Sequence, residues 1–207
     1  MGTVNRNLYI EILRREHLSD MKLYQKHPKP LWQEPSKKLV EYLNKITIPD
    51  MPIVDVACGY GRNGAYLAIR DYAITFVDMD NDCLNFIAKG KKVSEEGDIP
   101  LTNISVIKAD LTEEWPFPEK SLGGIICVHF YYPGLLNKWI RSLVHNGFLY
   151  FETIEARMNN ASILPDAHEI REILEDDFTI LHYSEREVKN YNYPRKKVSC
   201  TSFAVKT

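Results

Sequence analysis

Short apolar runs alternate with stretches of helical periodicity along most of the chain. The runs occupy residues 52–56, 73–77, 104–107, 124–128 and 148–153, and the helical stretches 64–70, 81–93 and 135–144. Near-continuous apolar runs indicate strands covered on both faces, and their alternation with helices indicates right-handed crossovers between parallel strands. The pattern predicts an α/β fold with a doubly wound, mostly parallel, seven-stranded sheet of the Rossmann-like kind.

The two ends of the chain have different patterns. Residues 1–34 mix charges, aromatics and prolines without a clean period, and we interpret them as an N-terminal extension, a candidate cover for a site. From Ser36, a candidate N-cap, apolar residues recur at helical spacing over about three turns. Residues 178–183 and 198–205 are strand-like, with no helical pattern between them, which predicts a closing antiparallel hairpin. The main domain is expected at 35–207.

Composition narrows the function classes. The length of 207 residues suits one main domain, and a net charge of −2 gives no general attraction to nucleic acid or anionic lipid. Four cysteines are scattered without metal-ligand spacing, which favours a reduced, cytoplasmic protein without a metal site. No apolar stretch approaches the length of a membrane span. A basic group near the C-terminus, Lys189 and 195–197, either contacts phosphates or is a solvated face.

A glycine-rich segment follows the first apolar run. Gly59, Gly61 and Gly64 fit the pattern G-x-G-x-x-G, in which glycines let the backbone turn tightly and approach a ligand beside a helix N-terminus. Taken alone, this short string is weak evidence for a dinucleotide such as NAD.

Acidic residues at the strand ends point to a different ligand. Asp55 lies in the first strand, and Asp78 and Asp110 follow the next two. The ligand crevice of such a sheet lies outside the carboxyl ends of its strands, so the three carboxylates should converge on one pocket. A carboxylate beside a pyrophosphate is repulsive, whereas a cationic ligand with hydroxyl groups fits these acids.

The segment from Asp55 to Gly61 resembles motif I of the class I methyltransferases, D-x-G-x-G-x-G, with Ala57 in place of the first glycine. The Gly-x-Gly-Arg-Asn string and the chain length are most similar to the small-molecule subgroup that includes tellurite-resistance methyltransferases. The resemblance implies S-adenosylmethionine as the cofactor and a methyl group transferred by in-line displacement.

The resemblance also implies roles for individual residues. The backbone from Ala57 through Cys58 and Gly59 to Gly61 would contact the methionine part, Asp55 would orient its ammonium and Arg62 would pair with its carboxylate. The further candidate cofactor residues are Asp78 for the ribose, Met79 for the adenine face, Asp110 and Leu111 for the adenine edge, and Val128 at the end of the fourth strand.

Structural alternatives stand beside these roles. Asp55 could only brace loop N–H groups, and Arg62 could be a surface residue of the helix. Asp78 and Asp110 could each cap a helix or a turn. An acidic run at 78–82 also suggests a calcium loop, but Cys83 and Lys89 occupy positions where such a loop needs glycine and glutamate, so we predict no metal there.

The acceptor side should lie at the ends of the fourth and fifth strands. His129 is a candidate base for a hydroxyl, thiol or amine acceptor, or else a structural histidine, and Glu152 lies near the end of the fifth strand. Tyr131, with Tyr132, could close over the acceptor or only cover the edge of the core. The Asn/Asp-Pro-Pro-Tyr/Phe signature of amine methylation in nucleic-acid and glutamine enzymes is absent after the fourth strand, which favours a small-molecule acceptor.

Three other functions remain open at this point. One is an RNA or protein methyltransferase of the same fold, which would change the acceptor and keep the chemistry. The second is an NAD-dependent oxidoreductase, and the third is a non-catalytic binding module with a degenerate pocket. The sequence leaves the oligomeric state unknown.

Overall fold

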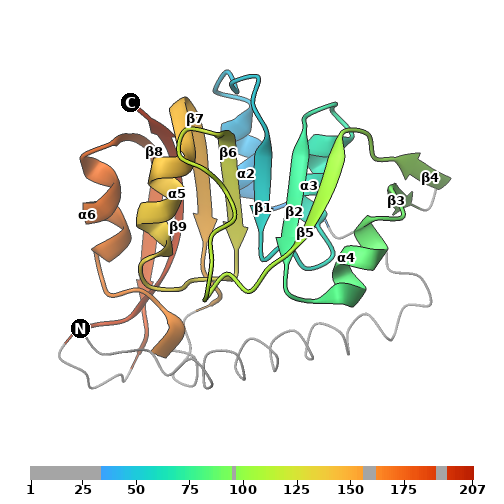
Figure 1. The fold of residues 1–207 in the computed structure, drawn as a ribbon. Helices are drawn as coiled ribbons and strands as arrows, with labels where there is room; N and C mark the ends of the chain where they lie inside the picture. Colours follow the sequence, from blue (N-terminus) through green and yellow to red (C-terminus); the bar gives the residue numbers. More distant parts are fainter. Residues whose placement is uncertain (1–33, 95–96, 156–161, 190–194) are drawn as a thin grey trace.

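The computed structural model describes residues 34–94, 97–155, 162–189 and 195–207 and contains a seven-stranded sheet. Its strand order is β5-β2-β1-β6-β7-β9-β8 (Figure 1). These strands are β1 (Ile53–Val56), β2 (Ile74–Asp78), β5 (Ile104–Lys108), β6 (Leu122–Val128), β7 (Leu143–Glu152), β8 (Phe178–Glu187) and β9 (Val198–Lys206). The first five are parallel, and β9 inserts antiparallel between β7 and β8. The doubly wound fold and the antiparallel C-terminal hairpin are confirmed.

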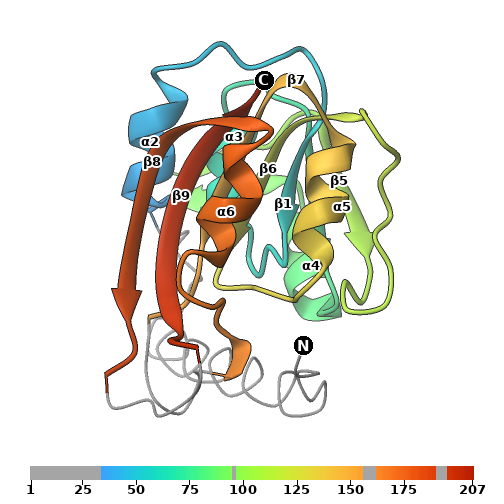
Figure 2. The same ribbon diagram turned by 90° about the vertical axis from the view of Figure 1, so that its left-hand side faces the viewer.

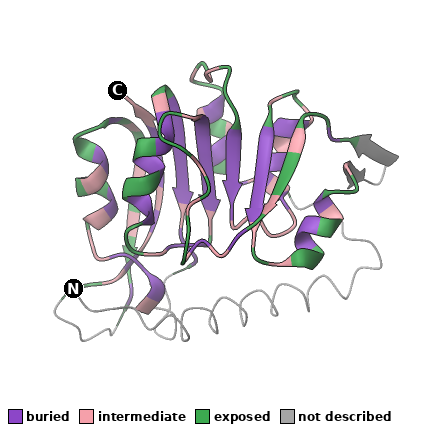
Figure 3. Ribbon diagram, viewed as in Figure 1, coloured by how far each residue is buried: buried purple, intermediate pink, exposed green. Residues whose placement is uncertain are grey.

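Helices cover both faces of the sheet (Figure 2). Helices α2 (Lys37–Leu43) and α3 (Arg62–Ala68) bury apolar residues in one core cluster, and α5 (Leu135–Ser142) and α6 (Glu169–Glu175) bury theirs in the other. Alternate residues of each central strand enter opposite clusters, as with Ile53 and Val54 of β1. Strands β1, β2 and β6 are therefore buried along almost their whole length, as Figure 3 shows, because both faces are covered.

The helix expected at 81–93 is wrong in its second half. Helix α4 (Asn81–Ile87) begins where the Asp80 side chain accepts hydrogen bonds from the Asp82 and Cys83 N–H groups, and it ends before Gly90, whose φ is 68°. A left-handed glycine stops a helix, and here the chain continues into a hairpin of β3 (Lys91–Ser94) and β4 (Gly97–Pro100).

Two further expectations need correction. Helix α6, which lies between β7 and β8, was not expected, although Ile170 and Leu174 of this helix are fully buried. Helix α2 begins after Ser36 as expected but has only seven residues, and the Ser36 side chain makes no capping hydrogen bond. The proposed N-terminal extension falls almost entirely outside the described residues. Among the helices that are described, none is long and apolar enough to cross a membrane.

Candidate active site

The strand register brings the candidate residues to one edge of the sheet. Val56 pairs with Val77 on one side and with Cys127 on the other, and Val128 pairs with Glu152. The strand ends of β2, β1, β6 and β7 are therefore level with one another. The strand order reverses between β1 and β6, and such a switch point opens a crevice at the carboxyl ends of the strands.

The loop after β1 alternates left-handed residues, with φ angles of 49° at Ala57, 53° at Gly59 and 75° at Gly61. A Cβ atom at Gly61 or Gly64 would overlap the Phe76 ring, so these two glycines are needed for packing of the loop and α3 against β2. A Cβ atom at Gly59 would meet nothing within 4 Å. The Gly59 backbone therefore has open space beside it, as a loop that approaches a ligand requires.

Asp55 lies beneath this loop with 2% of its surface exposed. Its Oδ2 accepts a hydrogen bond of 2.8 Å from the Gly64 N–H. Burial raises the pKa of Asp55 to about 7, while the Gly64 hydrogen bond and the charge of Arg62 oppose that rise. This carboxyl group therefore braces the start of α3.

Asp78 closes the loop from the neighbouring strand. One of its carboxylate oxygens accepts from the Gly59 N–H at 2.8 Å, and the other accepts from the Asp80 N–H at 2.9 Å. The Met79 side chain that follows is 43% exposed. The carboxylate therefore couples the end of β2 directly to the open position of the glycine loop.

Asp110 forms a turn after β5. Its Oδ1 accepts from the Thr112 N–H at 2.9 Å and from the Thr112 hydroxyl at 2.6 Å. The Leu111 side chain is buried in the core cluster that contains α5. The structure thus gives Asp110 the turn role that stood as the alternative, at the carboxyl end of the same sheet.

Arg62 and Asn63 connect the loop to the segment before α2. The Arg62 guanidinium donates to the Glu34 carbonyl at 3.3 Å and to the Ser36 hydroxyl at 3.5 Å. The buried Asn63 accepts from the Ser36 N–H at 2.9 Å. Sequence reasoning missed Asn63, although a polar residue among buried neighbours such as Ala65 signals a buried amide that needs a partner.

Two further cofactor candidates, Cys58 of the loop and Val128 of β6, carry no charge. Burial and the nearby carboxylates of Asp55 and Asp78 raise the pKa of the Cys58 thiol well above its usual range, so the thiol keeps its proton. Val128 is partly buried and packs against the core cluster that contains α3. Among the described residues, no group of three or more acidic, histidine or cysteine side chains could hold a metal ion.

The two candidate residues on the acceptor side, His129 and Tyr131, have different environments in the structure. The His129 side chain is 47% exposed, and its Nε2 lies 3.8 Å from Oε1 of Glu152. Tyr131 is 7% exposed, and its hydroxyl donates to Glu169 of α6 at 2.6 Å. Tyr131 therefore occupies the core edge, as its structural alternative required.

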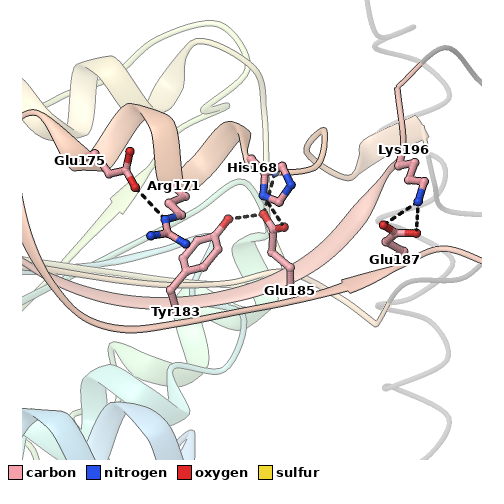
Figure 4. Close-up of polar contacts among 7 residues, drawn as sticks. All are labelled: His168, Arg171, Glu175, Tyr183, Glu185, Glu187 and Lys196. Atoms are coloured by element: carbon pink, nitrogen blue, oxygen red, sulfur yellow. Dashed lines mark hydrogen bonds and ion pairs between the residues drawn. The ribbon is translucent and has the colours of Figure 1, made fainter.

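A cavity of about 430 Å³ opens beside His129 at this edge of the sheet. The residues that line it are polar or charged: His129, Glu152, Thr153, Glu155, Ser184, Glu185, Arg186, Ser199, Cys200 and Thr201. Figure 4 shows Tyr183 and His168 directed at Glu185, which accepts hydrogen bonds from the Tyr183 hydroxyl and the His168 N–H. Glu185, on the cavity wall contributed by β8, is thus held by a neighbour on the same strand and by the residue that precedes α6.

Three residues of the basic group near the C-terminus, Arg195, Lys196 and Lys197, are ion-paired. Lys196 contacts Glu187 at 2.8 Å, also visible in Figure 4. Lys197 and Arg195 contact Asp166 at 2.8 and 3.5 Å. These contacts favour a solvated, ion-paired face over a phosphate site.

Known proteins share parts of this sequence and this fold. Residues 53–147 match the methyltransferase domain family, and no curated protein sequence matches the chain. The structure resembles TehB of Haemophilus influenzae with a TM-score of 0.59 and 18% identity, over 83% of this chain and 62% of TehB. This chain thus corresponds to less than two thirds of the length of TehB.

Two other solved structures share the fold. An S-adenosylmethionine-dependent methyltransferase of Aquifex aeolicus has a TM-score of 0.57 and 18% identity, over 88% of this chain and 96% of that protein. Geranyl diphosphate C-methyltransferase of Streptomyces coelicolor, solved with S-adenosylhomocysteine, has a TM-score of 0.58 and 12% identity, over 83% of this chain and 76% of that protein. These similarities show the class I methyltransferase fold, and residues 53–147 match the methyltransferase domain family within it.

Proposed function

We propose that this protein transfers a methyl group from S-adenosylmethionine to a small molecule. The observation that supports this most strongly is the level row of strand ends, which places the open Gly59 loop, Asp78 and the cavity beside His129 along one edge of the sheet. The cofactor and the acceptor would meet at the carboxyl ends of β1 and β6, where the strand order reverses.

The described residues fit this cofactor. The open side of Gly59 admits the methionine part, and the acidic edge suits its ammonium and the ribose hydroxyls. Asp78 would accept from the ribose while it holds the Gly59 N–H, and the exposed Met79 would cover the adenine face. Asp110 and the Leu111 N–H would read the adenine edge. When bound, the cofactor supplies an activated methyl group on a sulfonium.

Asp55 and Arg62 would act less directly than the sequence suggested. Asp55 positions the loop through the Gly64 N–H, and Arg62 ties α3 to Glu34 and Ser36. Both would shape the methionine site through the backbone from Ala57 to Gly61.

A small acceptor is favoured by the size of the cavity, about 430 Å³, which lies in the usual range of small-molecule sites. The net charge of −2 and the ion-paired basic residues give little support to an RNA acceptor. The four cysteines, all within the described residues, form no disulfide, which fits a reducing, cytoplasmic location.

Calorimetric titration with S-adenosylmethionine, S-adenosylhomocysteine and NAD tests the cofactor. We expect micromolar binding of the first two and none of NAD. Transfer of a labelled methyl group to small acceptors, compared with total RNA and a protein extract, then tests the acceptor class. Labelling of RNA or protein alone would replace the small-molecule proposal.

A further inference from the structure

His129 and Glu152 form a pair on the wall of the cavity. The His129 N–H donates to the Glu152 carbonyl at 2.7 Å, and Nε2 of the ring lies 3.8 Å from Oε1 of the carboxylate. His129 has a φ of 66°, so the chain turns sharply where β6 ends. Left-handed residues other than glycine are uncommon, and they gather at functional sites.

A buried tyrosine holds the carboxylate of this pair. Tyr150 is fully buried, and its hydroxyl donates to Oε2 of Glu152. Burial and the adjacent carboxylate raise the pKa of Tyr150 above its usual range, so the phenol remains a donor. One oxygen of Glu152 is therefore occupied from within the core, and the other lies toward His129.

We propose that His129 accepts the proton of the methyl acceptor and that Glu152 is its positioning residue, held in turn by Tyr150. This inference rests on the proposed methyltransferase function and specifies its acceptor as a small molecule with an N–H or O–H group. Nε2 is the ring nitrogen that faces the Glu152 carboxylate, and we therefore assign Nδ1 as the basic nitrogen.

The chemical step balances with these groups alone. The acceptor nitrogen or oxygen forms a bond to the methyl carbon, while the carbon–sulfur bond breaks and its electron pair stays on sulfur. The proton of the acceptor passes to Nδ1 of His129, and Glu152 stabilises the imidazolium. A thiol that is already ionised needs no such base.

Other charged groups also face His129 across the cavity. Glu155 follows β7, and Glu185 and Arg186 belong to β8; Arg186 lies 4.0 Å from Glu155 and partly compensates it. Glu152 is the carboxylate that forms an ion pair with the imidazole when the ring is protonated.

The pairing can be tested by NMR titration of the imidazole protons, with S-adenosylhomocysteine bound and His129 assigned from the His129→Gln spectrum. Glu152→Gln should lower the titration midpoint of His129 by roughly half a pH unit, since it removes a partly exposed opposite charge. Glu187→Gln is the matched control, because that carboxylate pairs with Lys196 and does not line the cavity. An unchanged midpoint in Glu152→Gln would overturn the pair.

The role as base is tested by methyl transfer to a panel of small amines, phenols and thiols. His129→Gln should reduce kcat for the amine or phenol acceptors by about a hundredfold or more, with cofactor affinity retained and ionised thiols less affected. If His129→Gln methylated the amines and phenols as fast as the wild type does, His129 would be excluded as the base. A wild-type protein that fails to bind S-adenosylmethionine would instead reject the proposed function itself.

Discussion

At the scale of single residues, the buried carboxyl of Asp55 makes stability depend on pH. Its pKa is about 7 in the folded protein, against an ordinary value of 3.8. The folded state therefore keeps a proton that the unfolded state has lost between about pH 4 and 7. This contribution to stability is fully present below pH 4 and is lost as the pH rises through 7.

Asp55→Asn removes this titration but leaves an amide oxygen for the Gly64 N–H. We expect the unfolding free energy of the variant, relative to wild type, to increase with pH between about 4 and 7 and then to level off. The full change should be a few kcal/mol at most, since one pKa unit corresponds to about 1.4 kcal/mol. Urea unfolding at several pH values measures it, with the exposed Asp50→Asn as control; parallel curves would contradict the assigned burial effect.

Asp78 has two roles, because it holds the glycine loop and is the proposed partner of the ribose. Asp78→Ala removes the acceptor of the Gly59 and Asp80 N–H groups together with the ribose contact. We expect affinity for S-adenosylhomocysteine to fall at least about tenfold, equivalent to about 1.4 kcal/mol. Calorimetry measures this change, and an unaltered affinity in a folded variant would remove Asp78 from the site.

At the scale of elements, a comparison of Gly59 with Gly90 distinguishes the effect of backbone strain from the effect of a ligand contact. Gly59 and Gly90 have φ angles of 53° and 68°, and neither would bring a Cβ atom within 4 Å of a neighbour. Alanine at either position should therefore lower the unfolding free energy by a similar amount, roughly 1 kcal/mol. Only Gly59→Ala should weaken binding of S-adenosylhomocysteine, by calorimetry, because only that position borders the proposed cofactor. Equal binding by the two variants would argue against backbone contact at Gly59.

The turn after β6 is tied to α6 by Tyr131, whose hydroxyl donates to Glu169. Tyr131→Phe should cost about 1 kcal/mol of stability in urea unfolding, because a hydrogen bond in the core edge is lost. It should leave kcat nearly unchanged on any acceptor that the wild type methylates. A large loss of kcat with normal stability would restore Tyr131 as a catalytic candidate.

The sequence predicted the central strands well because burial on both faces makes their apolar runs nearly continuous. It could not locate the end of α4, since a glycine such as Gly90 is compatible with a helix, a turn or a hairpin until its backbone conformation is known. Helix α6 was missed because seven residues give little periodic signal, and Ile170 and Leu174 are buried only through packing against the C-terminal strands.

For the site, spacing alone identified the glycine loop and the acids at the strand ends. The partners of those residues could not be predicted, because bonds such as Ser36 to Asn63 and Asp78 to Gly59 join positions far apart in sequence. Arg62 likewise bonds to Glu34 and Ser36, which lie outside the glycine motif.

For the whole molecule, the cofactor should act as a stabiliser, because its site exists only when β1, β2 and β6 are assembled into one sheet. S-adenosylhomocysteine at about one hundred times its Kd would add about 2.7 kcal/mol to the unfolding free energy. For a domain of this size, about 1 kcal/mol corresponds to roughly 2–4 °C, so Tm should rise by about 5–10 °C. NAD at the same concentration should leave Tm unchanged, and scanning calorimetry compares the two. A rise with NAD and none with S-adenosylhomocysteine would mean that the acids at the strand ends accommodate a pyrophosphate after all, contrary to the electrostatic argument from Asp55 and Asp78.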